Sequence, residues 1–177
     1  MENVLPFLQI AILAYCAIAA IIDYRTGLIP NWLTFPGIFL PPLAYLIAIG
    51  PSAAAWSVGG VFICGFIPYV MFCKDAIGGG DVKLFAAIGA IATPLLTIIV
   101  PVEAQLYSYI VASVIALSQI AWKGSIKQSF KTMGIIISNL FKKAADKIPV
   151  DTSMTHSLRL GPSIFLGTLI CFAGNLF

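Results

Sequence analysis

The chain has 177 residues, of which 60% are hydrophobic and only 10% charged; its mean hydropathy is +1.00 and its net charge is +3. This composition excludes an ordinary soluble domain. The length suits about six or seven membrane spans of ~20 residues with connecting loops, and leaves no room for a separate soluble domain. We therefore expect an all-α protein, a polytopic membrane helical bundle in which residues 1–177 form a single domain.

Six apolar stretches predict the transmembrane helices. In chain order they cover residues 5–22, 32–49, 53–73, 84–100, 104–122 and 160–177. The second stretch contains three prolines, which predict a kinked or partly irregular helix: Pro36, Pro41 and Pro42.

Between the last two spans, residues 123–148 place apolar side chains at three- and four-residue steps with lysines between them. This pattern predicts a cytoplasmic amphipathic helix whose lysines face anionic lipid headgroups. A buried stretch or a short re-entrant segment is the alternative interpretation.

The positive charges fall on one side of the membrane. Alternating six spans puts all ten Lys and Arg residues in the connections 23–31, 74–83 and 123–159. The positive-inside rule makes that side cytoplasmic and puts both termini outside the cytoplasm. Asp23, at the end of the first span, and Asp81, just before the fourth, then lie at one depth near the cytoplasmic face.

Both carboxylates stand beside turn-forming sequence. Asp81 follows three glycines, residues 78–80, which let the backbone turn tightly and approach another chain closely. Asp23 precedes the Ile29-Pro30-Asn31 turn between the first two spans. The structural alternatives are a helix N-cap for Asp81 and, for Asp23, an ion pair with Arg25 or with a lysine at the level of the lipid headgroups. An acid at this depth in an apolar chain is costly, which favours a functional pair.

Two carboxylates that share a site do not both ionise easily. The ionised one can take a proton from water while the protonated one polarises a peptide carbonyl. The four cysteines form no CxxC pair and there is a single histidine, so we expect no metal and no cofactor. Asp75, next to Lys74, is the alternative acid, but it lacks the glycine approach.

Two segments together resemble a known family. Asp23-Tyr-Arg-Thr-Gly-Leu-Ile-Pro-Asn31, followed by Gly78-Gly-Gly-Asp-Val-Lys-Leu84, resembles the type IV prepilin peptidases. These are GxGD-type aspartyl proteases of the bacterial inner membrane, related in motif to archaeal preflagellin peptidases. Residues 159–162, Arg-Leu-Gly-Pro, are similar to the family's C-terminal Gly-Pro element.

The resemblance assigns roles to individual residues. It implies that Asp23 and Asp81 are the catalytic pair. The supporting residues that it implies shape the loop around Asp81 or set the turn and cap of the second span: Gly78, Gly80, Lys83, Pro30 and Asn31.

The resemblance also implies an activity and a location. The chain would be an aspartic endopeptidase of the inner membrane that cuts the basic leader from prepilin or pseudopilin precursors. Larger family members carry a cysteine-pair zinc region and an N-methyltransferase activity. Without CxxC pairs, this chain resembles short forms that cleave without methylating, often for tight-adherence (Flp-type) pili. The expected partners are prepilins and membrane lipid but no nucleic acid, and the oligomeric state is not predicted.

Three other functions fit parts of the pattern. A preflagellin-type peptidase would use the same acid pair. A proton-coupled transporter or channel would also use paired intramembrane acids, but it predicts an acid nearer the bilayer midplane and broken-helix symmetry. A non-catalytic membrane assembly subunit would tolerate Asn at both positions.

Overall fold

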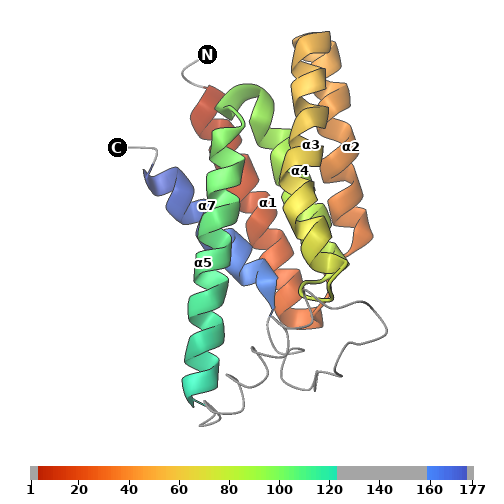
Figure 1. Ribbon diagram of the computed structural model, residues 1–177. Helices are drawn as coiled ribbons and strands as arrows, with labels where there is room; N and C mark the ends of the chain where they lie inside the picture. Colours follow the sequence, from red (N-terminus) through yellow and green to blue (C-terminus); the bar gives the residue numbers. More distant parts are fainter. Residues whose placement is uncertain (1–3, 123–158, 175–177) are drawn as a thin grey trace. The chain divides into compact units, whose positions relative to one another are not determined.

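The computed structural model describes residues 4–122 and 159–174, except for the side chains of residues 120–122, and this part of the chain is mostly helical. Its helices are α1 (Val4–Thr26), α2 (Asn31–Ala48), α3 (Pro51–Phe72), α4 (Gly79–Leu96), α5 (Ile99–Trp122) and α7 (Leu160–Gly174) (Figure 1). The all-α prediction is confirmed. The amphipathic helix predicted for residues 123–148 lies outside the described residues.

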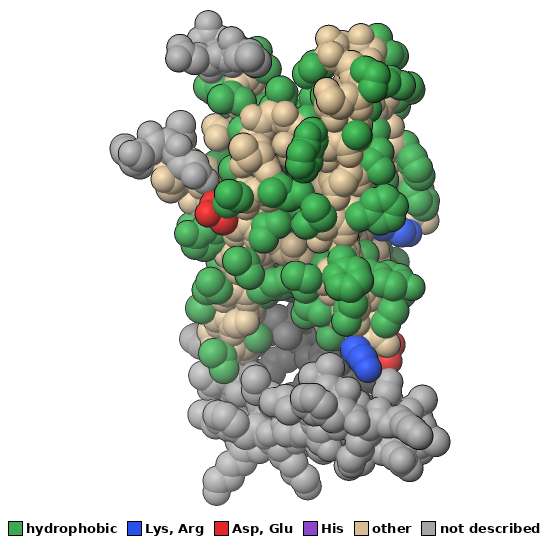
Figure 2. All heavy atoms as spheres, turned by 45° about the horizontal axis from the view of Figure 1, so that its top comes forward, with side chains coloured by type: hydrophobic (Ala, Val, Ile, Leu, Met, Phe, Trp, Pro, Cys, Tyr) green, Lys and Arg blue, Asp and Glu red, His purple; other side chains and the backbone are tan. Residues whose placement is uncertain are grey.

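The helices follow the predicted spans in order. Five of them, α1 to α5, are long and apolar enough to cross a membrane, whereas α7 is a shorter apolar helix of 15 residues. Large hydrophobic side chains are exposed along α1, α2 and α3, and hydrophobic side chains cover much of the face seen in Figure 2. Such surfaces suit contact with lipid rather than water. The chain is an integral membrane protein.

Helix α2 runs unbroken through its three prolines, so the partly irregular backbone predicted there is not what the structure shows. A segment that faces lipid keeps its remaining helical hydrogen bonds because no water is present to replace them. Its neighbour also supports it: the hydroxyl of Tyr45 donates a 2.7 Å hydrogen bond to the carbonyl of Ile91 in α4.

Two helix starts differ from prediction. Helix α4 begins at Gly79 rather than at residue 84, and α5 begins at Ile99 rather than at residue 104. The hydropathy of both first turns is too low for them to be counted as part of a span. In α4 the cause is the glycines, and in α5 it is Pro101 and Glu103. Proline is tolerated in the first turn of a helix. As a result, Asp81 lies inside the first turn of α4.

The chain divides into two compact units, one formed by residues 1–111 with 159–177 and the other by residues 112–158. The first unit contains α1 to α4, the first half of α5, and α7. Both acids predicted as the catalytic pair belong to it. The second unit contributes only the last part of α5 to the described residues.

Helix α4 is the central helix of the first unit. Most of its length is buried, whereas only about a fifth of each of α1, α2 and α3 is buried. Against α3 it packs backbone to backbone, because a Cβ on Gly60 would collide with the carbonyl of Gly89, and a Cβ on Gly89 with that of Gly60. The hydroxyl of Ser57 in α3 also donates to the carbonyl of Ala90 at 2.7 Å. These contacts fix α4, and with it Asp81.

Candidate functional site

Three helix ends meet at one end of the first unit: the last turn of α1 and the first turns of α4 and α7 (Figure 1). Asp23 and Asp81 lie there, only 6% and 9% exposed. Their carboxylates are near enough for their charges to interact. Asp75, the alternative acid, is exposed and occupies a turn with a positive φ of 58°. The structure thus brings together the two acids that the sequence predicts.

Asp81 is held by its own turn. It is the third residue of α4, and its Oδ2 accepts a 3.1 Å hydrogen bond from the backbone N–H of Gly78. This is the carboxylate half of a capping box, so Asp81 stabilises the helix start from inside the helix rather than as the N-cap residue. The bond occupies one carboxylate oxygen. In the described part of the chain, no hydrogen bond is made to the other.

The glycines before Asp81 give room for a close approach. A Cβ on Gly80 would lie 3.0 Å from Cβ and 3.3 Å from the carbonyl oxygen of Ile29. A Cβ on Gly78 would lie 3.1 Å from the bonded oxygen of Asp81. The α1–α2 turn therefore packs directly on the backbone of α4's first turn, next to the carboxylate.

Asp23 is held by a distant part of the chain. The backbone N–H of Gly161, in the first turn of α7, donates a 2.9 Å hydrogen bond to Asp23 Oδ2. The first amides of a helix are unpaired and carry partial positive charge, which favours an anion there. Gly161, rather than the Arg25 that sequence offers as an alternative, is thus the partner of Asp23. A Cβ on Gly161 would lie only 2.7 Å from Asp23 Cβ.

A lysine joins α4 to α2 beside the acids. Lys83 Nζ donates a 2.8 Å hydrogen bond to Asn31 Oδ1 and lies 4.9 Å from the ring centroid of Phe35. Of the two residues expected to set the turn and cap of the second span, Pro30 occupies the N-cap position of α2, without a side-chain cap bond, and Asn31 is the first residue of the helix. The Asn31 amide instead accepts the stronger, charge-assisted hydrogen bond from lysine.

Sequence reasoning missed the role of Gly161, for which the only signal was the Gly-Pro pair that opens the last helix. It also missed two polar residues of α5 that look like span residues in the sequence: Tyr109, which packs against Phe85 of α4, and Gln105, which bonds to Tyr109 and to the Cys64 carbonyl of α3. No cluster of three or more His, Cys, Asp or Glu side chains that could hold a metal occurs among residues 4–122 and 159–174.

These features define an integral membrane protein with a buried pair of carboxylates at one end of a helical bundle. Residues 10–120, more than half of the chain and including both acids, match the type IV leader peptidase family. The chain belongs to that family.

Two relatives of the chain have names that describe prepilin peptidases. The chain is similar to the prepilin leader peptidase/N-methyltransferase of Vibrio cholerae, with 33% identity over 103 residues, 54% of this chain and 37% of the relative. It is also similar to prepilin peptidase EppA of Methanothermobacter thermautotrophicus, with 36% identity over 107 residues, 56% of this chain and 25% of the relative. The similarity therefore spans well under half of either relative's length. No solved structure matches the chain.

Proposed function

We propose that this protein is an aspartic endopeptidase that removes the leader peptide from type IV prepilin-like precursors, with Asp23 and Asp81 as its catalytic pair. The observation that carries the proposal is the meeting of these two buried carboxylates, each bonded through one oxygen to a backbone amide at a helix start. Family membership and the names of both relatives support it.

The pair can hydrolyse a peptide bond without a cofactor. The ionised carboxylate takes a proton from a water molecule, whose oxygen attacks the peptide carbonyl carbon while the protonated carboxylate donates to the carbonyl oxygen. Collapse of the tetrahedral intermediate breaks the C–N bond and delivers a proton to the leaving amine, and the pair returns to its singly protonated state. The backbone amides of Gly78 and Gly161 hold the acids for this step.

The substrate class follows from where the acids lie. Both occupy terminal turns of membrane helices, and Arg25, Lys74, Lys83 and Arg159 lie in or next to the same end of the helices. By the positive-inside rule this end faces the cytoplasm of an inner-membrane protein with both termini outside. A prepilin joins a short basic cytoplasmic leader to a long apolar helix, and a site at this boundary suits that junction. A transporter would need an acid nearer mid-membrane.

A cleavage assay tests the proposal. Purified protein in detergent is mixed with a prepilin, and release of the leader is followed by mass spectrometry. Asp23→Asn and Asp81→Asn should each slow cleavage at least about 1,000-fold, as loss of a member of a catalytic unit does. The matched control Asp75→Asn changes an exposed acid and should cleave at the wild-type rate. Normal cleavage by both dyad variants would reject the proposal.

A further inference from the structure

The residue before α7 does not suit the start of a helix. Arg159 directly precedes Leu160, the first residue of α7. This N-cap position favours Ser, Thr, Asp or Asn, whose side chains accept hydrogen bonds from the free amides of the first turn. Arginine has no acceptor atom, and its positive charge faces the positive end of the helix dipole. Helix capping therefore does not explain an arginine here, and the explanation has to come from its contacts outside α7.

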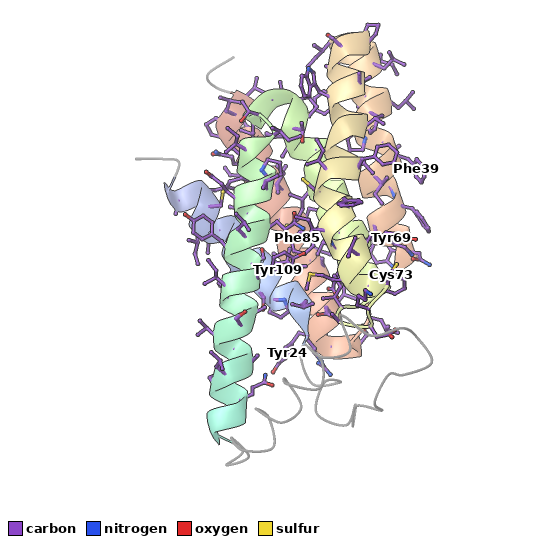
Figure 3. The ribbon with its side chains drawn as sticks, in the orientation of Figure 1. Tyr24, Phe39, Tyr69, Cys73, Phe85 and Tyr109 are labelled. Carbon is purple, nitrogen blue, oxygen red and sulfur yellow. The ribbon has the colours of Figure 1, made fainter. Side chains whose placement is uncertain are left out.

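Arg159 contacts the last turn of α1. Its guanidinium carbon lies 5.7 Å from the ring centroid of Tyr24, a distance at which the face of an aromatic ring attracts a cation. Figure 3 shows Tyr24 at the end of α1. Both side chains are exposed, the tyrosine at 69%. Neither belongs to the hydrophobic core, so burial in the bundle does not account for them.

This contact lies beside the bond that holds Asp23. Tyr24 follows Asp23 in α1, and Arg159 stands two residues before the glycine whose amide holds the acid. The Gly161 amide donates its 2.9 Å hydrogen bond to Asp23 Oδ2, so two contacts join the same two short segments. The fit is tight, since a Cβ on Gly161 would lie 2.7 Å from Asp23 Cβ. A small shift of the α7 start would therefore change the length or direction of the bond to the carboxylate.

We propose that Arg159 is a positioning residue: by resting on Tyr24, it fixes the start of α7 so that the first amides of this helix meet Asp23. This inference rests on the proposed peptidase function. Catalytic groups act well only when neighbouring contacts hold them to within about 0.5 Å of the productive geometry. One hydrogen bond restrains the distance to the carboxylate but leaves the helix start free to turn about it. The second contact restrains that rotation, and Arg159 itself takes no part in proton transfer.

Kinetics of leader cleavage in detergent test the role of the cation. Arg159→Gln removes the charge and should lower kcat about two- to fivefold, the factor that an exposed cation–π contact can supply, with KM for the prepilin unchanged. Arg159→Lys keeps a cation for the ring and should retain most of the rate. Tyr24→Leu should reproduce the loss, and Tyr24→Phe should not, because phenylalanine keeps the ring face. Arg25→Gln, which changes an exposed arginine next to Tyr24, is the matched control and should behave as wild type.

Combined variants separate positioning from other roles of an arginine. If both side chains act through one contact, Arg159→Gln with Tyr24→Leu should be no slower than either single variant. Gly161→Ala is expected to displace Asp23 by itself, so adding Arg159→Gln to it should slow cleavage no further. Direct binding of the substrate by Arg159 would instead raise KM and would add to the effect of Gly161→Ala. Either of those results refutes the positioning role.

The outcomes also separate this inference from the function on which it rests. If Arg159→Gln and Tyr24→Leu cleave as fast as wild type while Asp23→Asn has lost activity, the positioning role is refuted and the peptidase stands. A fall in kcat that appears only with a matching fall in the thermal midpoint also refutes it, because the contact would then serve folding. If the wild-type protein cleaves no prepilin, both fail together.

Discussion

The two carboxylates of the site differ in how the chain holds them. Asp81 receives its backbone hydrogen bond from Gly78, three residues earlier, whereas Asp23 receives its bond from Gly161, 138 residues later. The geometry of Asp81 is thus set within one turn of α4, and that of Asp23 by the packing of α7 against α1. The proposed catalytic pair is thus built from one local and one long-range part. Each half can therefore be disturbed separately.

The largest effect should come from the long-range half. Gly161→Ala places a methyl group 2.7 Å from Asp23 Cβ and 2.8 Å from its bonded oxygen. Asp23 must shift, and a displacement of about 1 Å at a reacting group can slow catalysis about 100-fold. We expect that loss in kcat for leader cleavage, measured in detergent, with Asp81 and α4 undisturbed.

Gly174→Ala is the control, because a Cβ at this other glycine of α7 meets nothing within 4 Å in the described structure. Equal activity of the two variants would show that the Gly161 contact does not position Asp23.

A smaller effect is expected from the local half. Gly80→Ala brings a methyl group to 3.0 Å from Ile29 Cβ, a tight contact that the α1–α2 turn can partly relieve by moving. We expect cleavage to slow about tenfold, since the shift is shared between Asp81 and the turn. Gly79→Ala is the neighbouring control, because its Cβ makes an ordinary 3.4 Å contact with Phe72. If both alanines behave alike, close packing on Ile29 is not what positions Asp81.

The smallest effect should come from the contact that joins α4 to α2. Lys83→Met keeps most of the side-chain stem but removes the donor of the hydrogen bond to Asn31. Asn31→Leu removes the acceptor of the same bond. Each change should slow cleavage less than about threefold and cost about 0.5–1 kcal/mol of stability, the usual worth of one hydrogen bond. The double variant should be no worse than either single one in thermal unfolding and cleavage. Additive losses would mean that the two side chains act independently.

Much of this fold follows from hydropathy and charge. The apolar stretches predict the order of the helices because a lipid-facing segment must be apolar along its whole length. They predict the helix starts less well, because the first turn of α4 is made of glycines and an acid. That turn is helical because Asp81 accepts the Gly78 amide and because α3 and the α1–α2 turn pack against the glycines. A hydropathy average along the sequence does not contain these contacts, so it cannot predict that the turn is helical.

The candidate site likewise has features that the sequence predicts and features that it does not. The motifs predict Asp81 behind its glycines and Asp23 before its turn, since those signals are local in the chain. Other parts of the site depend on packing between helices. The Gly161 bond and the Lys83–Asn31 contact each join two helices, and the Gln105–Tyr109 pair lies within α5 and faces its neighbours. One sequence without its packing cannot indicate which glycine of α7 lies against an acid of α1. The Gly161-Pro162 pair indicates that a helix starts there, but it does not indicate that this helix start contacts Asp23.

The position of Gly161 also has a consequence for how the protein is made. Helix α1 is synthesised first and α7 after all the other described helices. Asp23 is therefore made long before Gly161, whose amide bonds to it. Until the last of these segments is inserted, the growing chain carries Asp23 without the contact that orients it. Completion of the proposed site is thereby coupled to the synthesis and insertion of α7.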